Sequence, residues 1–219
     1  MQLVKVFTFC ALVLSTVSAR AEEIRGTVKF TGAAPKAASI PVTKDQTACG
    51  TSVPDESAVI ANGKLANVVV VVKGVPAQAG KAVLDNQKCR YAPHVQAAAV
   101  GSAFEIQNSD PVLHNSHGYL GTTSTFNVAM PLKNQKVTKK LDKPGAHKVK
   151  CDVHPWMSAY VYVADGASAV SGADGSFAIP NVPPGKYTLT AWHERFGEKT
   201  AEVTVPASGA GNVEFAFGG

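Results

Sequence analysis

The chain has 219 residues and a formal net charge of +5, with 17% charged and 45% hydrophobic residues. This composition excludes a disordered chain, which would be more charged and less apolar, and the charge is too small to indicate nucleic-acid binding. Gly and Pro are common, and aromatic and β-branched residues occur in short runs, which is typical of all-β proteins with one large or two small domains.

Residues 1–21 have the pattern of a secretory signal peptide. Lys5 lies in a short basic region, residues 6–17 form an apolar run too short to span a bilayer, and small residues precede and include Ala21. We expect cleavage near Ala21 and a periplasmic or otherwise secreted protein. Loss of Lys5 and Arg20 would lower the formal charge to +3. No later segment is apolar for long enough to predict a transmembrane helix.

Cleavage also changes the cysteine count. Cys10 would leave with the signal, and Cys49, Cys89 and Cys151 would remain. An odd number of cysteines in an oxidising compartment leaves one thiol free. If Cys151 is a metal ligand it must be a thiolate, so we expect a disulfide between Cys49 and Cys89. The alternative is a buried Cys151 that binds no metal.

The first strands of the expected mature chain are easily recognised. Residues 24–30 alternate apolar and polar side chains before a Thr-Gly turn, which predicts a strand. Residues 59–61 and 65–72 flank Asn62-Gly63, which predicts a hairpin whose turn residues have positive φ. The run 68–72 is continuously apolar, which suits a strand covered on both faces.

Short strands and turn residues then alternate through the middle of the chain, as in a compact β-sandwich. Eight strands are expected, over residues 82–84, 95–100, 104–107, 113–119, 125–128, 136–141, 147–151 and 159–163. The segments 170–179, 182–192, 201–205 and 213–217 then alternate in the same way, with strands separated by Asp-Gly and Pro-Pro-Gly turns.

The segment Cys151-Asp-Val-His154-Pro155-Trp156-Met157 offers a thiolate, an imidazole and a thioether to one metal ion from a single loop. His114 is the best candidate for a second imidazole, and a set of two His, one Cys and a distant axial Met predicts a type 1 (blue) copper site. Zinc is the leading competitor, but a thioether is a poor zinc ligand. Pro155 is expected to help fix the tight turn.

The two segments "NSDPVLHNSHGY" and "GAHKVKCDVHPWMSAYVYV" resemble amicyanin and its cupredoxin relatives, over roughly residues 80–165. The resemblance implies that His114, Cys151 and His154 are equatorial copper ligands and Met157 the axial one. It also implies that Asn115 ties the two ligand-bearing loops together by hydrogen bonds. One departure is Val149, where amicyanin-like sequences carry an aromatic residue.

A second resemblance concerns the two ends of the chain. The segment "GADGSFAIPNVPPGKYTLTAWHE" is similar to the end of carboxypeptidase regulatory-like domains, which are small transthyretin-like sandwiches, and residues 26–28 and 67–74 resemble their opening. We therefore expect an all-β protein in which a Greek-key cupredoxin sandwich, residues 79–165, is inserted into a smaller transthyretin-like sandwich made of residues 22–78 and 166–219. A tandem arrangement is the alternative topology.

The surroundings of the copper loop leave several interpretations open. In cupredoxins the second loop histidine usually has an edge near solvent, so Trp156 either forms part of an exposed docking surface for a partner or packs inward as a lid over the metal. His117 and His94 are interpreted as structural more readily than as metal-binding residues. Seven lysines between residues 133 and 150 either steer an acidic partner or protect an exposed strand edge.

The sequence thus predicts a monomeric, extracytoplasmic blue copper protein that binds one copper ion. It would carry single electrons between redox proteins, such as a dehydrogenase and a cytochrome. No enzyme is expected, because we recognise no catalytic triad, phosphate loop or haem-attachment motif. Two alternatives are a periplasmic copper carrier or storage protein and a β-sandwich interaction or adhesion module with an accessory copper site.

Overall fold

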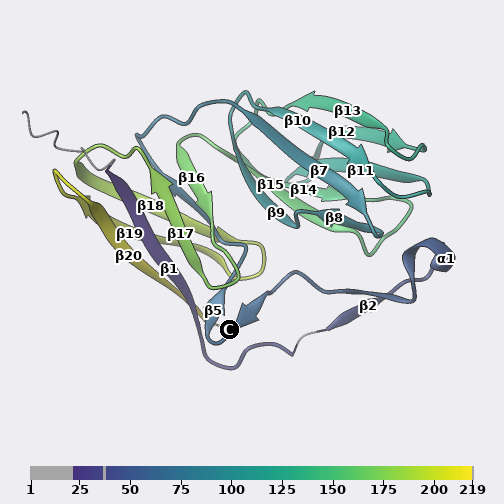
Figure 1. The fold of residues 1–219 in the computed structure, drawn as a ribbon, viewed down its shortest axis with the longest axis horizontal. Coiled ribbons are helices and arrows are strands. Elements are labelled where there is room, and N and C mark those ends of the chain that lie inside the picture. The colour runs from purple at the N-terminus through teal and green to yellow at the C-terminus, as the bar shows by residue number, and fades with distance from the viewer. Residues whose placement is uncertain (1–21, 37, 219) are drawn as a thin grey trace, which may run out of the picture.

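The computed structural model describes residues 22–36 and 38–218, and the expected signal peptide lies outside them. The described chain forms two β-sandwiches that lie side by side (Figure 1). Apart from one short helix, its regular elements are strands, so the predicted all-β fold class is confirmed.

The first sandwich combines strands from both ends of the chain. β1 pairs in parallel with β20 along its whole length and antiparallel with β17, while β6 lies between β16 and β18. This is the inserted arrangement, since the intervening residues form the other sandwich. One sheet contains β17 (Ser176–Pro180), β1 (Glu23–Thr31), β20 (Ala210–Gly218), β5 (Lys64–Leu65) and β4 (Ile60–Ala61). The other sheet contains β16 (Ala167–Val170), β6 (Val69–Val72), β18 (Gly185–His193) and β19 (Gly197–Val205).

The second sandwich is built from residues 81–164. All eight strands expected in this interval are present, and the structure adds the short β8, which forms a hairpin with β7. One sheet contains β13 (Lys136–Lys140), β10 (Ala103–Asn108), β7 (Lys81–Gln87) and β8 (Arg90–Ala92). The other sheet contains β12 (Thr123–Met130), β11 (His114–Leu120), β14 (Gly145–Lys150), β15 (Ser158–Ala164) and β9 (Val95–Ala99).

β6 explains how the two sandwiches are joined. Val70 and Val72 point into the core of the first sandwich, whereas Val69 and Val71 pack with Val95 and Ala164 of the second. Burying a valine side chain stabilises a fold by roughly 1.5–3 kcal/mol. The continuously apolar run is therefore covered on both faces, as predicted.

The hairpin predicted at Asn62-Gly63 is also confirmed, because both turn residues have positive φ, 52° and 68°, between β4 and β5. The chain does not continue as one strand from Leu65 to Val72, however. Asn67 has φ 61°, so the backbone turns there and separates β5 from β6. This break lets β5 join the sheet of β1 and β6 the opposite sheet.

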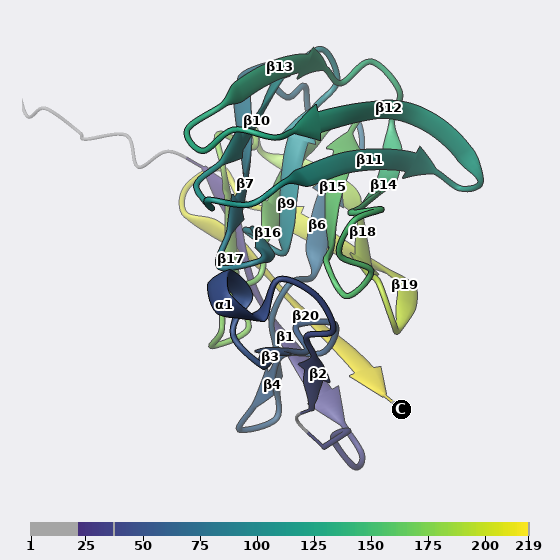
Figure 2. The same cartoon turned by 90° about the vertical axis from the view of Figure 1, so that its right-hand side faces the viewer.

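Residues 39–54, which we call the arm, differ from the expected domain boundaries. The arm contains β2 (Ser39–Pro41), α1 (Gln46–Cys49) and β3 (Ser52–Pro54), and it extends from the first sandwich along the end of the second (Figures 1 and 2). Val42, Cys49 and Val53 are buried in the core of the second sandwich. The arm therefore packs on the second sandwich, whereas the sequence predicts that residues 22–78 belong to the first.

The disulfide between Cys49 of the arm and Cys89 of the β7–β8 turn is formed, as predicted. It joins residues separated by 40 positions, and closing a loop of this size stabilises a fold by roughly 4 kcal/mol in the chain-entropy model. Of the cysteines in the described residues, Cys151 is free and buried.

In residues 22–36 and 38–218, no helix has the length and apolar character needed to cross a membrane.

Candidate metal centre

The predicted metal-binding loop connects β14 to β15 in one tight turn. Cys151 follows the last residue of β14, and Met157 precedes the first residue of β15. The Met157 N–H donates to the carbonyl of His154 at 2.9 Å, and the Cys151 N–H donates to the carbonyl of Met157 at 3.4 Å. These bonds close the loop on itself, so its side chains are directed to one place. Pro155 lies at the exposed tip of the turn.

His114 reaches the same place from the start of β11, next to β14 in the sheet. The Nδ1 atoms of His114 and His154 lie 2.9 Å apart, and Cys151 Sγ lies 3.9 Å from Nδ1 of His154. Ligand atoms of all three residues are within 4.8 Å of one another, and all three side chains are buried. The structure thus brings together two imidazoles and a thiol from two distant segments.

Met157, the last residue of the loop, is buried in the same core cluster as Cys151. Two nitrogen donors and a thiolate are a soft, mixed set, which suits copper or zinc rather than magnesium or calcium. A buried thioether in the same core is a further soft group. The residues present therefore fit the predicted metal.

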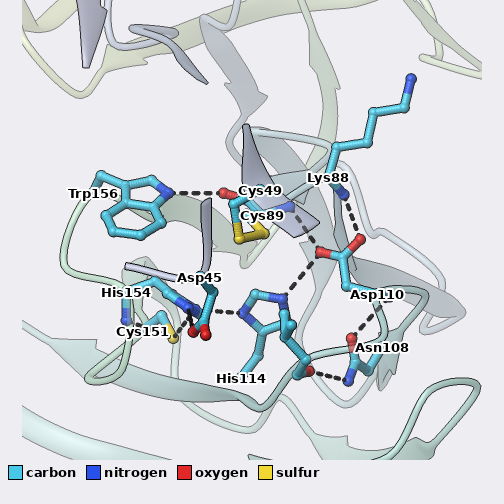
Figure 3. The surroundings of a disulfide bond; sticks show 11 residues. Asp45, Cys49, Lys88, Cys89, Asn108, Asp110, His114, Cys151, His154 and Trp156 are labelled. Carbon is cyan, nitrogen blue, oxygen red and sulfur yellow. Dashed lines mark hydrogen bonds and ion pairs between the residues drawn. A yellow bond between two sulfur atoms is a disulfide. The ribbon is translucent and has the colours of Figure 1, made fainter. Parts of the chain in front are cut away.

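Each imidazole is held from its far side by a carboxylate (Figure 3). His114 Nε2–H donates to Asp110 at 3.0 Å, and His154 Nε2–H donates to Asp45 at 2.8 Å. When the imidazole is neutral, as metal binding requires, donating the Nε2 proton outward leaves the Nδ1 lone pair directed inward, which is the usual way in which proteins fix metal-binding histidines. Both tautomers thus suit metal binding at Nδ1.

The electrostatics of the site favour the thiolate. Burial by itself would raise the pKa of Cys151, but hydrogen bonds from His114 and from the backbone of Asn115 and His154 outweigh burial and leave that pKa below its usual value. Burial would lower the pKa of His114, yet Asp110 and the Cys151 thiolate leave it raised. The site therefore stabilises the negative sulfur that metal binding requires.

Asn115 connects the two ligand-bearing segments. Its side-chain oxygen accepts the backbone N–H of Asp152 at 2.7 Å, and its side-chain N–H donates to the Asp152 carboxylate at 2.7 Å. Its carbonyl accepts the Tyr91 hydroxyl at 2.6 Å. His117 lies outside the donor set, where it hydrogen bonds to Asp152 at 3.0 Å, and so supports the loop from the surface.

Trp156 and His154 are not exposed, which agrees with the interpretation of Trp156 as an inward lid and not with a docking surface. His154 is 0% exposed and Trp156 only 9%. The two rings pack with their centroids 4.9 Å apart, and the indole N–H donates to the Cys89 carbonyl at 3.1 Å. Trp156 thus forms the lid of the site. The solvent-exposed histidine edge is missing because the arm covers it.

The other candidate residues have structural roles. His94 Nδ1 contacts the Ser158 carbonyl at 3.1 Å and its Nε2 pairs with the carboxylate of Glu194, which links the two sandwiches. β13 lies at the edge of its sheet, and its lysines are exposed. This position agrees with edge protection. The exposed lysines of the segment are Lys133, Lys136, Lys139, Lys140, Lys143, Lys148 and Lys150.

Sequence reasoning missed the two carboxylates. Asp110 stands four residues before His114 within the segment that carried the resemblance, so it was visible but unassigned. Asp45 lies in an ordinary polar stretch, 109 positions from His154. Its only signal is Cys49, four residues later, whose disulfide with Cys89 brings the arm to this end of the sandwich.

Comparison with known proteins agrees with both resemblances seen in the sequence. Residues 154–218 match the model of the carboxypeptidase regulatory-like domain family. The match begins inside the ligand loop and includes β15, which pairs in the second sandwich. A search of curated proteins finds no match.

Several solved structures resemble part of the chain. A purple cupredoxin from Nitrosopumilus maritimus has 20% identity and a TM-score of 0.31, and the alignment covers 37% of this chain and 98% of that one. Amicyanin from Paracoccus versutus has 22% identity and a TM-score of 0.34, with 43% and 96% covered. A copper-containing nitrite reductase from Thermus scotoductus has 17% identity and a TM-score of 0.33, with 48% and 25% covered.

The chain is thus an all-β protein that matches the carboxypeptidase regulatory-like domain family over residues 154–218 and whose solved structural neighbours include a purple cupredoxin and amicyanin.

Proposed function

We propose that this protein is a periplasmic or otherwise secreted blue copper protein that carries single electrons between redox partners. One copper ion would be held by Nδ1 of His114, Nδ1 of His154 and Sγ of Cys151, with the Met157 thioether as a fourth ligand. The observation that carries the proposal is the convergence of the two Nδ1 atoms, 2.9 Å apart, beside the buried Cys151 sulfur. No bond in a substrate would be broken.

Copper bound by two imidazoles, a thiolate and a thioether supplies a one-electron couple. The role of the protein is to keep these four ligand side chains in fixed positions. The loop hydrogen bonds fix His154 and Met157 relative to Cys151. Asn115 fixes the loop relative to the segment of His114. A donor set that cannot rearrange suits a site that must accept and release an electron without losing its metal.

The disulfide supports the proposed location, because stable disulfides occur mainly in oxidising compartments. The partners would be a dehydrogenase and a cytochrome or similar redox proteins. They would not touch His154 directly, since its ring is covered. Leu113 is 46% exposed and directly precedes His114, so we propose that the electron-exchange surface includes this residue.

The test is repeated reduction and reoxidation of the copper-loaded mature protein, with copper content measured after each cycle. An electron carrier should bleach with a mild reductant, recover its colour with an oxidant, and keep its copper through many cycles. The proposal would be overturned if the protein lost its copper on reduction. It would also be overturned if the reduced protein gave its copper to a Cu(I) chelator within one cycle, because either result identifies a carrier of the metal. Zinc bound in preference to copper would also overturn it.

A further inference from the structure

The arm reaches the metal centre, although it belongs to neither sheet of the second sandwich. Asp45 precedes α1, and its carbonyl accepts the N–H groups of Ala48 and Cys49 at 2.9 Å. Its carboxylate, with the side chain 38% exposed, accepts Nε2–H of the fully buried His154. The arm thus places one carboxylate between a candidate ligand and solvent.

The disulfide connects this carboxylate to the one behind the other imidazole. Cys49 lies on the helical turn that follows Asp45, and Cys89 is its disulfide partner. The Cys89 N–H donates to Asp110 at 2.7 Å, and the same carboxylate oxygen accepts Nε2–H of His114 at 3.0 Å. Figure 3 shows these residues gathered around the disulfide.

These bonds form a continuous series of contacts that connects the outer sides of the two imidazoles. It runs from His154 through Asp45 and α1 to the disulfide, and from there through Asp110 to His114. Covalent anchoring of the arm keeps Asp45 near His154, although the two residues lie on different segments. A carboxylate that accepts a proton from a ligating imidazole fixes the tautomer and makes the imidazole a stronger donor.

We propose that the arm is an outer clasp of the metal centre, in which Asp45 is the positioning residue of His154 and the Cys49–Cys89 disulfide keeps it in place. The proposal rests on the proposed copper function for its metal-binding consequences. It also has a consequence for the metal-free protein, because the clasp contacts the buried His154, which lies beside the buried Cys151. The two consequences can therefore be tested separately.

The first experiment measures Cu(II) affinity by competition with a chelator and the reduction potential of the bound copper. Removing such a carboxylate typically weakens metal binding 10–100-fold, so Asp45→Ala should do so. Asp45→Asn should lose less affinity, because its amide oxygen still accepts the hydrogen bond. Both variants should have a higher reduction potential than the wild type, since a negative charge that favours Cu(II) is removed.

The matched control is Asp142→Asn, which removes the same charge from an exposed carboxylate paired with Lys140. It should leave Cu(II) affinity and the reduction potential unchanged. The proposal fails if Asp45→Ala binds copper within twofold of this control. If Asp45→Asn binds Cu(II) as tightly as the control while Asp45→Ala binds it 10–100-fold more weakly, the hydrogen bond and not the charge is the positioning contact.

The second experiment measures the rate at which iodoacetamide alkylates Cys151 in the metal-free protein. The double variant Cys49→Ala/Cys89→Ala frees the arm, so alkylation should be at least tenfold faster than in the wild type, and Asp45→Ala should give an intermediate rate. Unchanged rates in both would overturn the clasp. If wild-type protein binds no copper but the rates differ as expected, the copper function fails and the clasp stands.

Discussion

At the scale of single residues, the ion pair between His94 and Glu194 depends on pH, because His94 is charged only when protonated. Burial by itself lowers the pKa of His94, but the hydrogen bond to Glu194 and the charges of Glu194 and Glu56 outweigh burial and leave that pKa raised. His94 belongs to the second sandwich and Glu194 to the first, so the pair joins the two.

A histidine whose pKa is raised by folding stabilises the folded state while it is protonated in both states, which here means below about pH 6.5. The contribution is lost as the pH rises through the raised pKa. Glu194→Gln should therefore lower the free energy of unfolding by roughly 1.5–3 kcal/mol near pH 5.5, the range for a hydrogen bond to a charged group. The difference from wild type should shrink above neutral pH.

Urea unfolding at several pH values measures this difference, with Glu202→Gln as a control at an exposed position of β19. Burial, the charge of His94 and the charge of Arg195 lower the pKa of His193 to about 4. A lowered histidine pKa makes the folded state less stable at low pH. His193 is present in both the wild type and Glu194→Gln, so its effect on the free energy of unfolding largely cancels in the comparison. A Glu194→Gln difference that grows with pH, or equals that of the control, would contradict the assignment.

At the scale of elements, close contact between strands leaves no room for a side chain at the centre of β1. Gly26 lies between β17 and β20, opposite Phe177 and Val213. A Cβ at this position would lie 2.5 Å from the backbone oxygen of Val213 and against the Phe177 ring. The ring can rotate, but the oxygen belongs to a paired strand and cannot move without disturbing the sheet.

Gly26→Ala should therefore lower the free energy of unfolding by about 1–3 kcal/mol, as overpacking usually does. The comparison is Gly80→Ala, where the added Cβ meets no described atom within 4 Å. Thermal and urea unfolding measure the effect. Copper binding by the folded Gly26→Ala protein should be unchanged, because β1 is in the other sandwich. Equal stability of the two variants would show that β1 tolerates a side chain here.

At the scale of the whole molecule, local patterns predicted much of the fold. The alternation of short strands and turns predicted the strands of the second sandwich, and the continuous run of valines predicted that β6 would be covered on both faces. The ligand loop could be recognised because Cys151, His154 and Met157 are close in sequence. His114 could be added because its own segment resembles the same family.

What the sequence did not predict depends on the path of the arm. No local pattern shows that residues 39–54 leave one sandwich and pack on the other, since their few buried side chains are Val42, Cys49 and Val53. The burial of His154 and Trp156 follows from that path. The resemblance to cupredoxins predicts a solvent-exposed edge of His154. The sequence of the loop does not show that a distant segment covers this edge.

The most direct test of the account is titration of the metal-free mature protein with Cu(II), followed by visible absorption, for the wild type and Cys151→Ser. We predict that the wild type binds one equivalent and develops an intense thiolate-to-copper absorption band. The variant should fold and lack that band. The account would be contradicted if the band persisted in Cys151→Ser, or if the wild type bound Cu(II) without developing it.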